Sequence, residues 1–476
     1  MDIAQQDDRT VTQAVPGFGE AAKVWMKIGL LGFGGPAGQI ALMHRELVEE
    51  RRWVSENRFL HALNYCMLLP GPEAQQLSIY IGWLLHGTRG GIVAGTLFVL
   101  PGFLVITGLS LLYALYHQSG WLEGLFFGLK AAVLAIVVEA VVRLGKRALT
   151  SNFSRTVAAV SFLALFVFKV PFPLVIIAAA MAGYLVAKFT AGGSPFSPRG
   201  EDARRADEGA VSANSEPAGP LIRPSRPPSP RGGEGKTEGA GWQRAVRVLA
   251  LWLALWIAPF LLIAAVAGLD SVFIAIGLFF SKMAIVTFGG AYAALSYVAQ
   301  QAVETHHWLL PGGMLDGLAL AETTPGPLVL VLSFVGFMGA LRGATGLDPL
   351  LAGVLGAVLT TWVTFIPCFL WIFLGAPYVE GLRHNRVLSA ALAAISAAVA
   401  GVILNLALWF GLHVLFAATT EIDWGPFSIT LPDLSSFRPL AFGLTLLALS
   451  VTFIGKRGVL PVLAICSVAG WLASLI

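Results

Sequence analysis

The chain has 476 residues, of which 56% are apolar and only 12% are charged, and its mean hydropathy is +0.76. An average globular domain carries roughly 25% charged residues, so this composition excludes an ordinary soluble protein and indicates a polytopic membrane protein. The net charge of +4 would suit a nucleic-acid-binding protein. In a membrane protein, however, an excess of Lys and Arg follows from the positive-inside rule, and we expect no nucleic-acid partner.

The first 20 residues are polar and acidic and contain no basic region followed by an apolar stretch, so no cleavable signal is predicted. We expect residues 1–20 to form a cytoplasmic segment and the first apolar segment to direct insertion. The three cysteines lie far apart within apolar segments and have no metal-ligand spacing, which favours packed thiols. Neither a metal nor a cofactor is expected.

Apolar segments of near-spanning length follow one another along the chain in two sets. The first set lies at about 21–43, 59–86, 91–116, 121–143, 153–169 and 171–190. The second set lies at about 247–268, 271–300, 312–340, 348–376, 386–413, 437–454 and 458–475. Between the two sets, residues 191–246 are rich in Pro, Gly, Ser and charged residues, which predicts a disordered cytoplasmic linker.

This pattern predicts an all-α polytopic membrane protein with about 13 apolar segments. A first repeat is expected at 21–190, an extra transmembrane helix at 247–268, and a second repeat at 269–476.

The two repeats are related by an offset of 255 residues. The FGG motif at 33–35 recurs at 288–290, and the PGP motif at 70–72 recurs at 325–327. Seven predicted crossings separate the starts of the two repeats, so the repeats should be inverted relative to each other across the membrane. Inverted repeats are a common construction of secondary transporters, which bind substrate near the midplane at broken helices.

The distribution of Lys and Arg gives the expected orientation. Basic residues concentrate in the linker and in those loops that the count of crossings places on the same side of the membrane as the linker. The N-terminus and the linker are therefore expected in the cytoplasm and the C-terminus outside. The loop at 44–58 contains four arginines and disagrees with a simple crossing count. Two explanations remain open. Its four glutamates offset the arginines, or the segments at 21–43 and 59–86 are re-entrant hairpins that turn back at FGG and PGP.

The breaks at FGG and PGP are the candidate substrate site. A broken helix exposes free N–H groups and the positive end of a helix dipole, which together attract an anion. Amide and hydroxyl side chains beside the breaks can bond to oxyanion oxygens. The candidate substrate-binding residues at the breaks are Gly34, Gly35, Gly71, Glu73, Gln75, Gln76, Gly289, Gly290, Glu322, Thr323, Thr324 and Gly326.

Charged residues inside apolar segments are rare and therefore informative. Lys27 and Lys282 each precede FGG by six residues, and they either attract the anion or snorkel to the interface. Lys130 is a further candidate for substrate binding. It lies nine residues from Glu139, so the two side chains face opposite ways on a helix and are not a simple pair.

The carboxylates at the breaks have two open interpretations. Glu73 and Glu322 would repel an anion, so they are protonated when substrate binds, which would couple transport to protons, or they cap a helix or pair with a lysine.

Several motifs together resemble the chromate ion transporter (CHR) family in its long-chain, two-domain form. They are FGGP after a lysine-bearing apolar stretch, a charged loop that ends in Trp53, and LLPGPEAQQLSIYIGWLLHGTRGG at 68–91. The second half adds KMAIVTFGGAYAALSYV at 282–298 and ETTPGPLVLVLSFVGF at 322–337. The similarity covers both halves of the chain, and the set of motifs is specific although each glycine motif alone is not.

The resemblance implies export of chromate from the cytoplasm across the cell (inner) membrane, which would confer chromate resistance. Membrane potential or a proton gradient would drive the export. Sulfate has nearly the same shape and charge, so transport of sulfate or another oxyanion is one alternative, and a passive anion channel is another. An intramembrane enzyme is not expected, because the eight histidines supply no catalytic cluster. Expected partners are the oxyanion and the lipid bilayer, with a homodimer as an open alternative.

Overall fold

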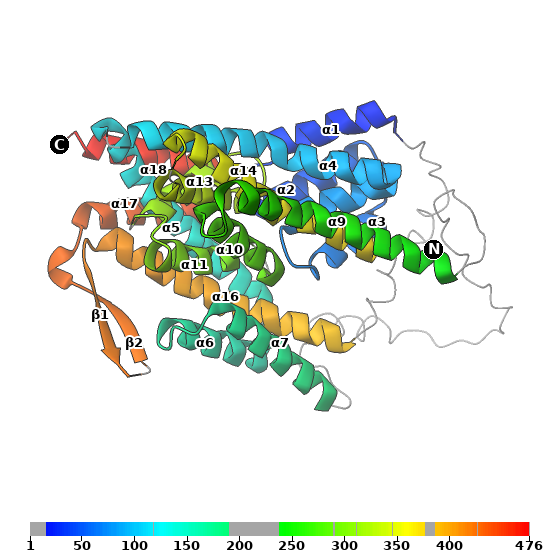
Figure 1. Cartoon of the computed structure of the whole chain (residues 1–476). Coiled ribbons are helices and arrows are strands. Elements are labelled where there is room, and N and C mark those ends of the chain that lie inside the picture. Colours follow the sequence, from blue (N-terminus) through cyan, green and yellow to red (C-terminus); the bar gives the residue numbers. More distant parts are fainter. Residues whose placement is uncertain are drawn as a thin grey trace.

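The computed structural model describes residues 16–117, 119–189, 238–288, 291–310, 312–344, 346–376, 386–425 and 427–475. Most of the predicted linker, and the predicted site residues Gly289 and Gly290, lie outside these ranges. The described chain is almost entirely helical (Figure 1). Its short β-hairpin, in the acidic loop around 421–433, was not predicted from the sequence.

The first half consists of helices interrupted at the predicted motifs. Its elements are α1 (Phe18–Leu31), α2 (Gly35–His44), the π-helix η1 (Arg45–Glu50), α3 (Glu56–Cys66), α4 (Glu73–Tyr116), α5 (Gly120–Ala148), α6 (Asn152–Phe166) and α7 (Phe172–Phe189). Within α4, His86 and Gly87 have non-helical backbone angles, which divide the helix into a short and a long part.

The second half begins with a peripheral helix and repeats the same order of elements. Its helices up to the last long one are α9 (Glu238–Ala267), α10 (Val272–Val286), α11 (Ala291–Gln300), η2 (Gln301–Thr305), α12 (Gly313–Glu322), η3 (Leu328–Leu330), α13 (Val331–Gly343), α14 (Pro349–Gly375) and α16 (Arg386–Leu415). The remaining elements are β1 (Thr419–Trp424), β2 (Phe427–Pro432), η5 (Leu434–Ser436), α17 (Pro439–Leu449), η6 (Ser450–Ile454) and α18 (Val459–Ala473). The two strands pair antiparallel.

Six helices within the described ranges are long and apolar enough to cross a membrane, namely α4, α5, α7, α9, α14 and α16. The protein is therefore a multi-pass membrane protein. Apart from α4, the helices next to the breaks are much shorter. At 1.5 Å per residue, the 14 residues of α1 cover roughly 21 Å, about two thirds of a bilayer core.

The chain turns back at the first FGG motif rather than continuing in the same direction. Gly34 and Gly35 both have positive φ angles, of 84° and 69°, which glycine adopts without steric cost. Lys27 Nζ of α1 lies 2.5 Å from a carboxylate oxygen of Glu46 in η1. A straight continuation would separate these residues by about 28 Å at helical rise, so the contact requires a hairpin.

The second break of the first half also forms a hairpin. The ring centroids of Tyr65 in α3 and Tyr80 in α4 are 5.7 Å apart, on either side of the PGP motif. In the second half, Phe279 of α10 contacts Trp308, which follows η2, at a centroid distance of 5.5 Å. The arginine-rich loop at 44–58 had two explanations, an offset of its arginines by glutamates or a pair of hairpins at FGG and PGP. These contacts agree with the hairpins.

The two halves exchange helices with each other. In Figure 1, α6 and α7 lie along α16, whereas α17 and α18 pack on α5. Gly183 of α7 faces Ala390 and Ala394 of α16, and Gly470 of α18 faces Gly128 of α5 in the same way. Small residues at these crossings let the helix backbones approach closely. Each half therefore completes its packing with a hairpin of the other half.

The long part of α4 and helix α14, which belong to different halves, run antiparallel. Gly91 of α4 lies against Phe373 of α14, and Gly95, one turn later, lies against Phe369, one turn earlier. The long part of α4 and α14 therefore cross the molecule in opposite directions.

Candidate functional site

The breaks of the two halves meet inside the protein. The backbone N–H of Gly71, in the first PGP motif, donates a hydrogen bond to the carbonyl oxygen of Thr287 at 2.8 Å. The backbone N–H of Gly326, in the second PGP motif, donates to the carbonyl oxygen of Gly32 at 3.0 Å. The two bonds are equivalent at the 255-residue offset. Each PGP break is thus held by the residue that precedes the FGG motif of the opposite half.

Two proline-bearing helix segments brace these breaks in the same reciprocal manner. Gly102 of α4 faces the carbonyl group of Pro325, so closely that a Cβ at this position would collide with it. Its counterpart in the second half is Cys368 of α14, whose sulfur would lie 3.1 Å from a Cβ on Gly71. The close approach explains why glycine occupies position 102 in the middle of a helix.

Three buried glutamine side chains surround the breaks. Gln39 of α2, which was not predicted as a site residue, donates from Nε2 to the carbonyl oxygens of Gly32, at 3.1 Å, and of Gly326. Gln76 donates to the carbonyl oxygen of Pro70 at 2.7 Å. The amide oxygens of Gln39, Gln75 and Gln76 have no hydrogen-bond partner among the described residues. These side chains retain hydrogen-bonding capacity at the centre of the fold.

The glutamates and threonines beside the breaks lie in different surroundings. Glu322 is buried and accepts a hydrogen bond of 2.8 Å from the Tyr292 hydroxyl. Arg143 on α5 lies within electrostatic range of Glu322, and Arg147, one turn later, lies within range of Glu73. The hydroxyls of the two predicted threonines both donate to the carbonyl oxygen of Leu320 and so bond back to the last turn of α12. These residues are Thr323 and Thr324.

The two equivalent lysines do not occupy equivalent environments. Lys27 forms its ion pair with Glu46, a buried carboxylate that Arg51 also contacts. Lys282 is exposed, and its ammonium lies 5.8 Å from the centroid of the Tyr297 ring. Lys27 therefore already has a carboxylate partner within the first half, which it shares with Arg51.

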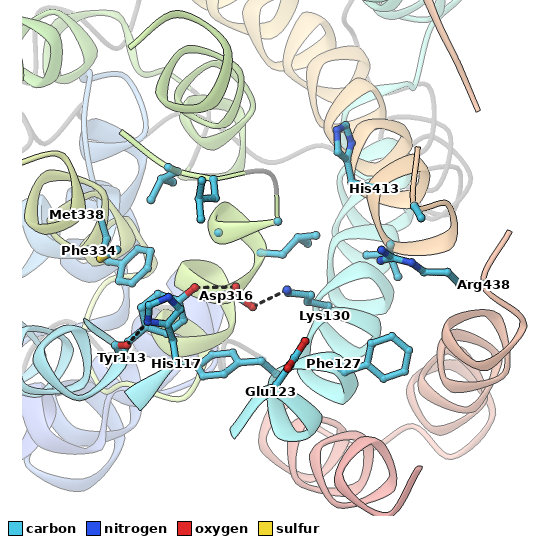
Figure 2. Close-up of a pocket in the computed structure, with 18 of the residues that line it drawn as sticks. Tyr113, His117, Glu123, Phe127, Lys130, Asp316, Phe334, Met338, His413 and Arg438 are labelled. Carbon is cyan, nitrogen blue, oxygen red and sulfur yellow. Dashed lines mark hydrogen bonds and ion pairs between the residues drawn. The ribbon is translucent and has the colours of Figure 1, made fainter. Parts of the chain in front are cut away.

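The third predicted lysine lies in a cavity of about 670 Å³ (Figure 2). Lys130 Nζ is 3.1 Å from Oδ1 of Asp316, in the first turn of α12. The Tyr113 hydroxyl donates to Oδ2 of the same carboxylate at 2.9 Å. Sequence reasoning established that Glu139 is no simple partner of Lys130 but missed Asp316, although an acidic residue inside an apolar segment was itself an available signal.

The cavity around Lys130, which we name the Lys130 cavity, is rich in cationic groups. Arg342 and Arg438 line it together with Lys130, against the two carboxylates of Glu123 and Asp316. His117 and His413 are also part of the lining, as are aromatic side chains of α5 and α13. Helix α12 runs from this cavity to the second PGP break, because its first turn carries Asp316 and its last residue is Glu322.

Among the described residues, no group of three or more His, Cys, Asp or Glu side chains is arranged to hold a metal ion. The chemistry that the site offers is the binding of an anion by lysine, arginine, amide and backbone N–H groups.

The chromate transporter family model matches residues 19–184 and 274–471. The chain belongs to the chromate transporter family. The two matched stretches correspond to the two halves that exchange helices in the fold. The family is one of membrane transporters, in agreement with the spanning helices of the structure.

Several named relatives match most of the chain. A chromate transport protein of Pseudomonas aeruginosa is 31% identical over 97% of this chain and 94% of its own length. A probable chromate transport protein of Synechococcus elongatus is 28% identical over 81% of this chain and 82% of its own. A chromate transport protein of Cupriavidus metallidurans is 27% identical over 80% and 79%. No solved structure matches the chain significantly.

Proposed function

We propose that the protein is a secondary transporter that exports chromate from the cytoplasm and thereby confers chromate resistance. One observation carries this proposal. In a chain of the chromate transporter family, the breaks of both halves meet beside glutamine side chains, and α12 connects them to the Lys130 cavity. Such a junction of broken helices is where secondary transporters bind their substrates.

The two halves are proposed to be inverted repeats, at 21–190 and 269–476. The antiparallel course of α4 and α14 supports this, as do the reciprocal hydrogen bonds of Gly71 and Gly326. The N-terminus and the linker are proposed to be cytoplasmic. The hairpins α1–α2 and α3–α4 are then re-entrant from the cytoplasm, and the Lys130 cavity opens to the outside.

The substrate is proposed to contact the polar side chains of the breaks and the backbone N–H groups at the starts of the helices that follow them, including the residues predicted there, with Lys130 as the attracting cation. The N–H groups of Gly71 and Gly326 themselves donate to Thr287 and Gly32, so these two glycines would shape the site rather than bind the anion. Each of the two ammonium groups has a carboxylate partner, and Lys130 is preferred over Lys27 because it lines a cavity together with Arg342 and Arg438, whereas Lys27 does not line that cavity. An anion that approaches Lys130 competes with Asp316 for the ammonium group.

The membrane potential is a sufficient driving force for export. Moving a dianion out of a negative interior releases about 2 × 2.3 kcal/mol per 100 mV. A proton gradient is the alternative, with Glu322 as the proton carrier. Sulfate or another oxyanion is the alternative substrate, and a passive anion channel is the alternative mechanism.

The test is flux of chromate and sulfate in proteoliposomes, with membrane potential and pH gradient set independently. Saturable chromate flux that accelerates with potential supports the proposal, whereas flux linear in concentration supports a channel. If the protein carries sulfate but no chromate, sulfate replaces chromate as the proposed substrate.

A further inference from the structure

A second cavity with cationic walls lies at the other end of α5. Its volume is about 470 Å³, and two parts of the chain that are distant in the sequence form it: α5, and η6 with the turn that leads to α18. We name it the Arg143 cavity. Its lining residues are Glu139, Val142, Arg143, Lys146, Thr452, Phe453, Lys456 and Arg457.

The charges of this cavity are unbalanced. Four cationic side chains face a single carboxylate, Glu139, which gives a net charge of +3 (4 − 1). Arg143 lies 3.9 Å from Glu139, so even this pair is at the limit of an ion pair. Like charges gathered around one cavity repel each other, and a bound anion would reduce the repulsion.

The turn that contributes half of the cations is held in an uncommon conformation. Lys456 has a φ angle of +48°, in the left-handed region that side-chain-bearing residues seldom adopt. The π-helix η6 directly precedes this turn, and π-helical segments occur frequently at functional sites. Both features place Lys456 and Arg457 opposite α5 instead of spreading them along the surface.

Helix α5 connects this cavity to the transport machinery. Arg143 is within electrostatic range of Glu322 at the second PGP break, and Lys130 lines the first cavity about 20 Å away along the same helix. We propose that the Arg143 cavity is the loading site for a divalent tetrahedral oxyanion on the cytoplasmic side. In this position it delivers the anion along α5 toward the breaks. This inference deepens the proposed function and rests on it for the direction of transport.

The same cationic chemistry would also hold the phosphate of an anionic lipid headgroup, so the experiment separates the two sources. The full-length protein is placed in nanodiscs of phosphatidylcholine alone, and binding of chromate and of sulfate is measured by equilibrium dialysis. The variants are Lys146→Gln and Lys456→Gln, with Lys146→Arg and Lys456→Arg as charge-conserving forms. The control is Arg155→Gln, an exposed arginine of α6 outside the cavity lining.

The expected result is at least a tenfold loss of oxyanion affinity in both glutamine variants, near-normal affinity in the arginine variants, and no change in the control. Melting temperatures measured in parallel exclude misfolding. In proteoliposomes the glutamine variants should raise KM for chromate presented on the cytoplasmic side and leave kcat nearly unchanged.

Unaltered oxyanion binding in the glutamine variants would overturn the loading site. The loading site would also be overturned if chromate flux required phosphatidylglycerol in the bilayer and the glutamine variants abolished that requirement. The cavity would then hold a lipid headgroup instead of the transported anion. Failure of the proposed function gives a different result, since the wild-type protein would bind the oxyanion in the cavity yet carry no chromate flux.

Discussion

The backbone N–H of Gly326 donates a hydrogen bond to the carbonyl oxygen of Gly32, 3.0 Å away, although the two residues belong to opposite halves of the chain. Gly71 and Thr287 form the equivalent bond at 2.8 Å. Each half therefore supplies the hydrogen-bond partner that a broken helix of the other half requires in a membrane, where lipid offers none. In the proposed transport cycle, these bonds would couple a movement of one half to the breaks of the other.

The contact between Gly102 and Pro325 makes a prediction about packing at the breaks. Gly102→Ala should destabilise the protein by about 1–3 kcal/mol, because the added methyl group collides with the Pro325 carbonyl. The measurement is thermal unfolding of the purified protein, together with chromate flux, which should fall.

The matched control lies on the same helix. Gly108 has nothing within 4 Å of the position of an added Cβ. Gly108→Ala should therefore be neutral or stabilise α4 by up to about 1 kcal/mol through helix propensity. Equal effects of the two substitutions would contradict the packing described for the second PGP break.

Substitutions in the Lys130–Asp316 ion pair distinguish a structural role of Lys130 from a role in transport. Lys130→Met should lower stability by about 1–3 kcal/mol, because it leaves a buried carboxylate without its cation. It should also reduce chromate flux at least tenfold. The double variant Lys130→Met with Asp316→Asn should regain stability but not flux, as measured by melting temperature and by initial rates in proteoliposomes.

Lys23→Met is the control for that series, since Lys23 is an exposed residue of α1. Recovery of flux in the double variant would show that Lys130 has only a structural role and would remove it from the substrate path.

The hairpins predict which loops face the cytoplasm. Ser55, between η1 and α3, is exposed, and Leu310, in the equivalent loop of the second half, is 60% exposed. In a cysteine-free background, Ser55→Cys should react with a membrane-impermeant maleimide only in inside-out vesicles. Leu310→Cys should react only in right-side-out vesicles. Labelling of both positions from one side would rule out inverted hairpins.

Glu322 is the residue that tests proton coupling. Glu322→Gln keeps an acceptor for the Tyr292 hydroxyl but cannot release or bind a proton. If protons drive export, flux in this variant should lose its dependence on the pH gradient and keep its dependence on membrane potential. Glu20→Gln, at an exposed position of α1, is the control. Unchanged dependence on the pH gradient in Glu322→Gln would show that Glu322 is not the proton carrier.

Much of the architecture can be derived from the sequence because it depends on local composition. Hydropathy locates the apolar segments, and Gly and Pro locate the breaks, since both act on the backbone where they stand. The repeat at offset 255 can be found without any structure. The β-hairpin of 419–432 was missed although its strands, TTEIDW and FSITLP, alternate polar and apolar residues on either side of Gly425, which is an available hairpin signal.

Contacts between distant segments required the tertiary structure. The turn-back at FGG follows from Lys27 and Glu46, and the partner of Lys130 is Asp316 in the opposite half. The exchange of α6–α7 and α17–α18 likewise depends on glycine contacts such as Gly128 with Gly470. Local pattern specifies where a helix forms and ends. Which helices meet, and which charges they bring together, is decided by side-chain packing over the whole fold.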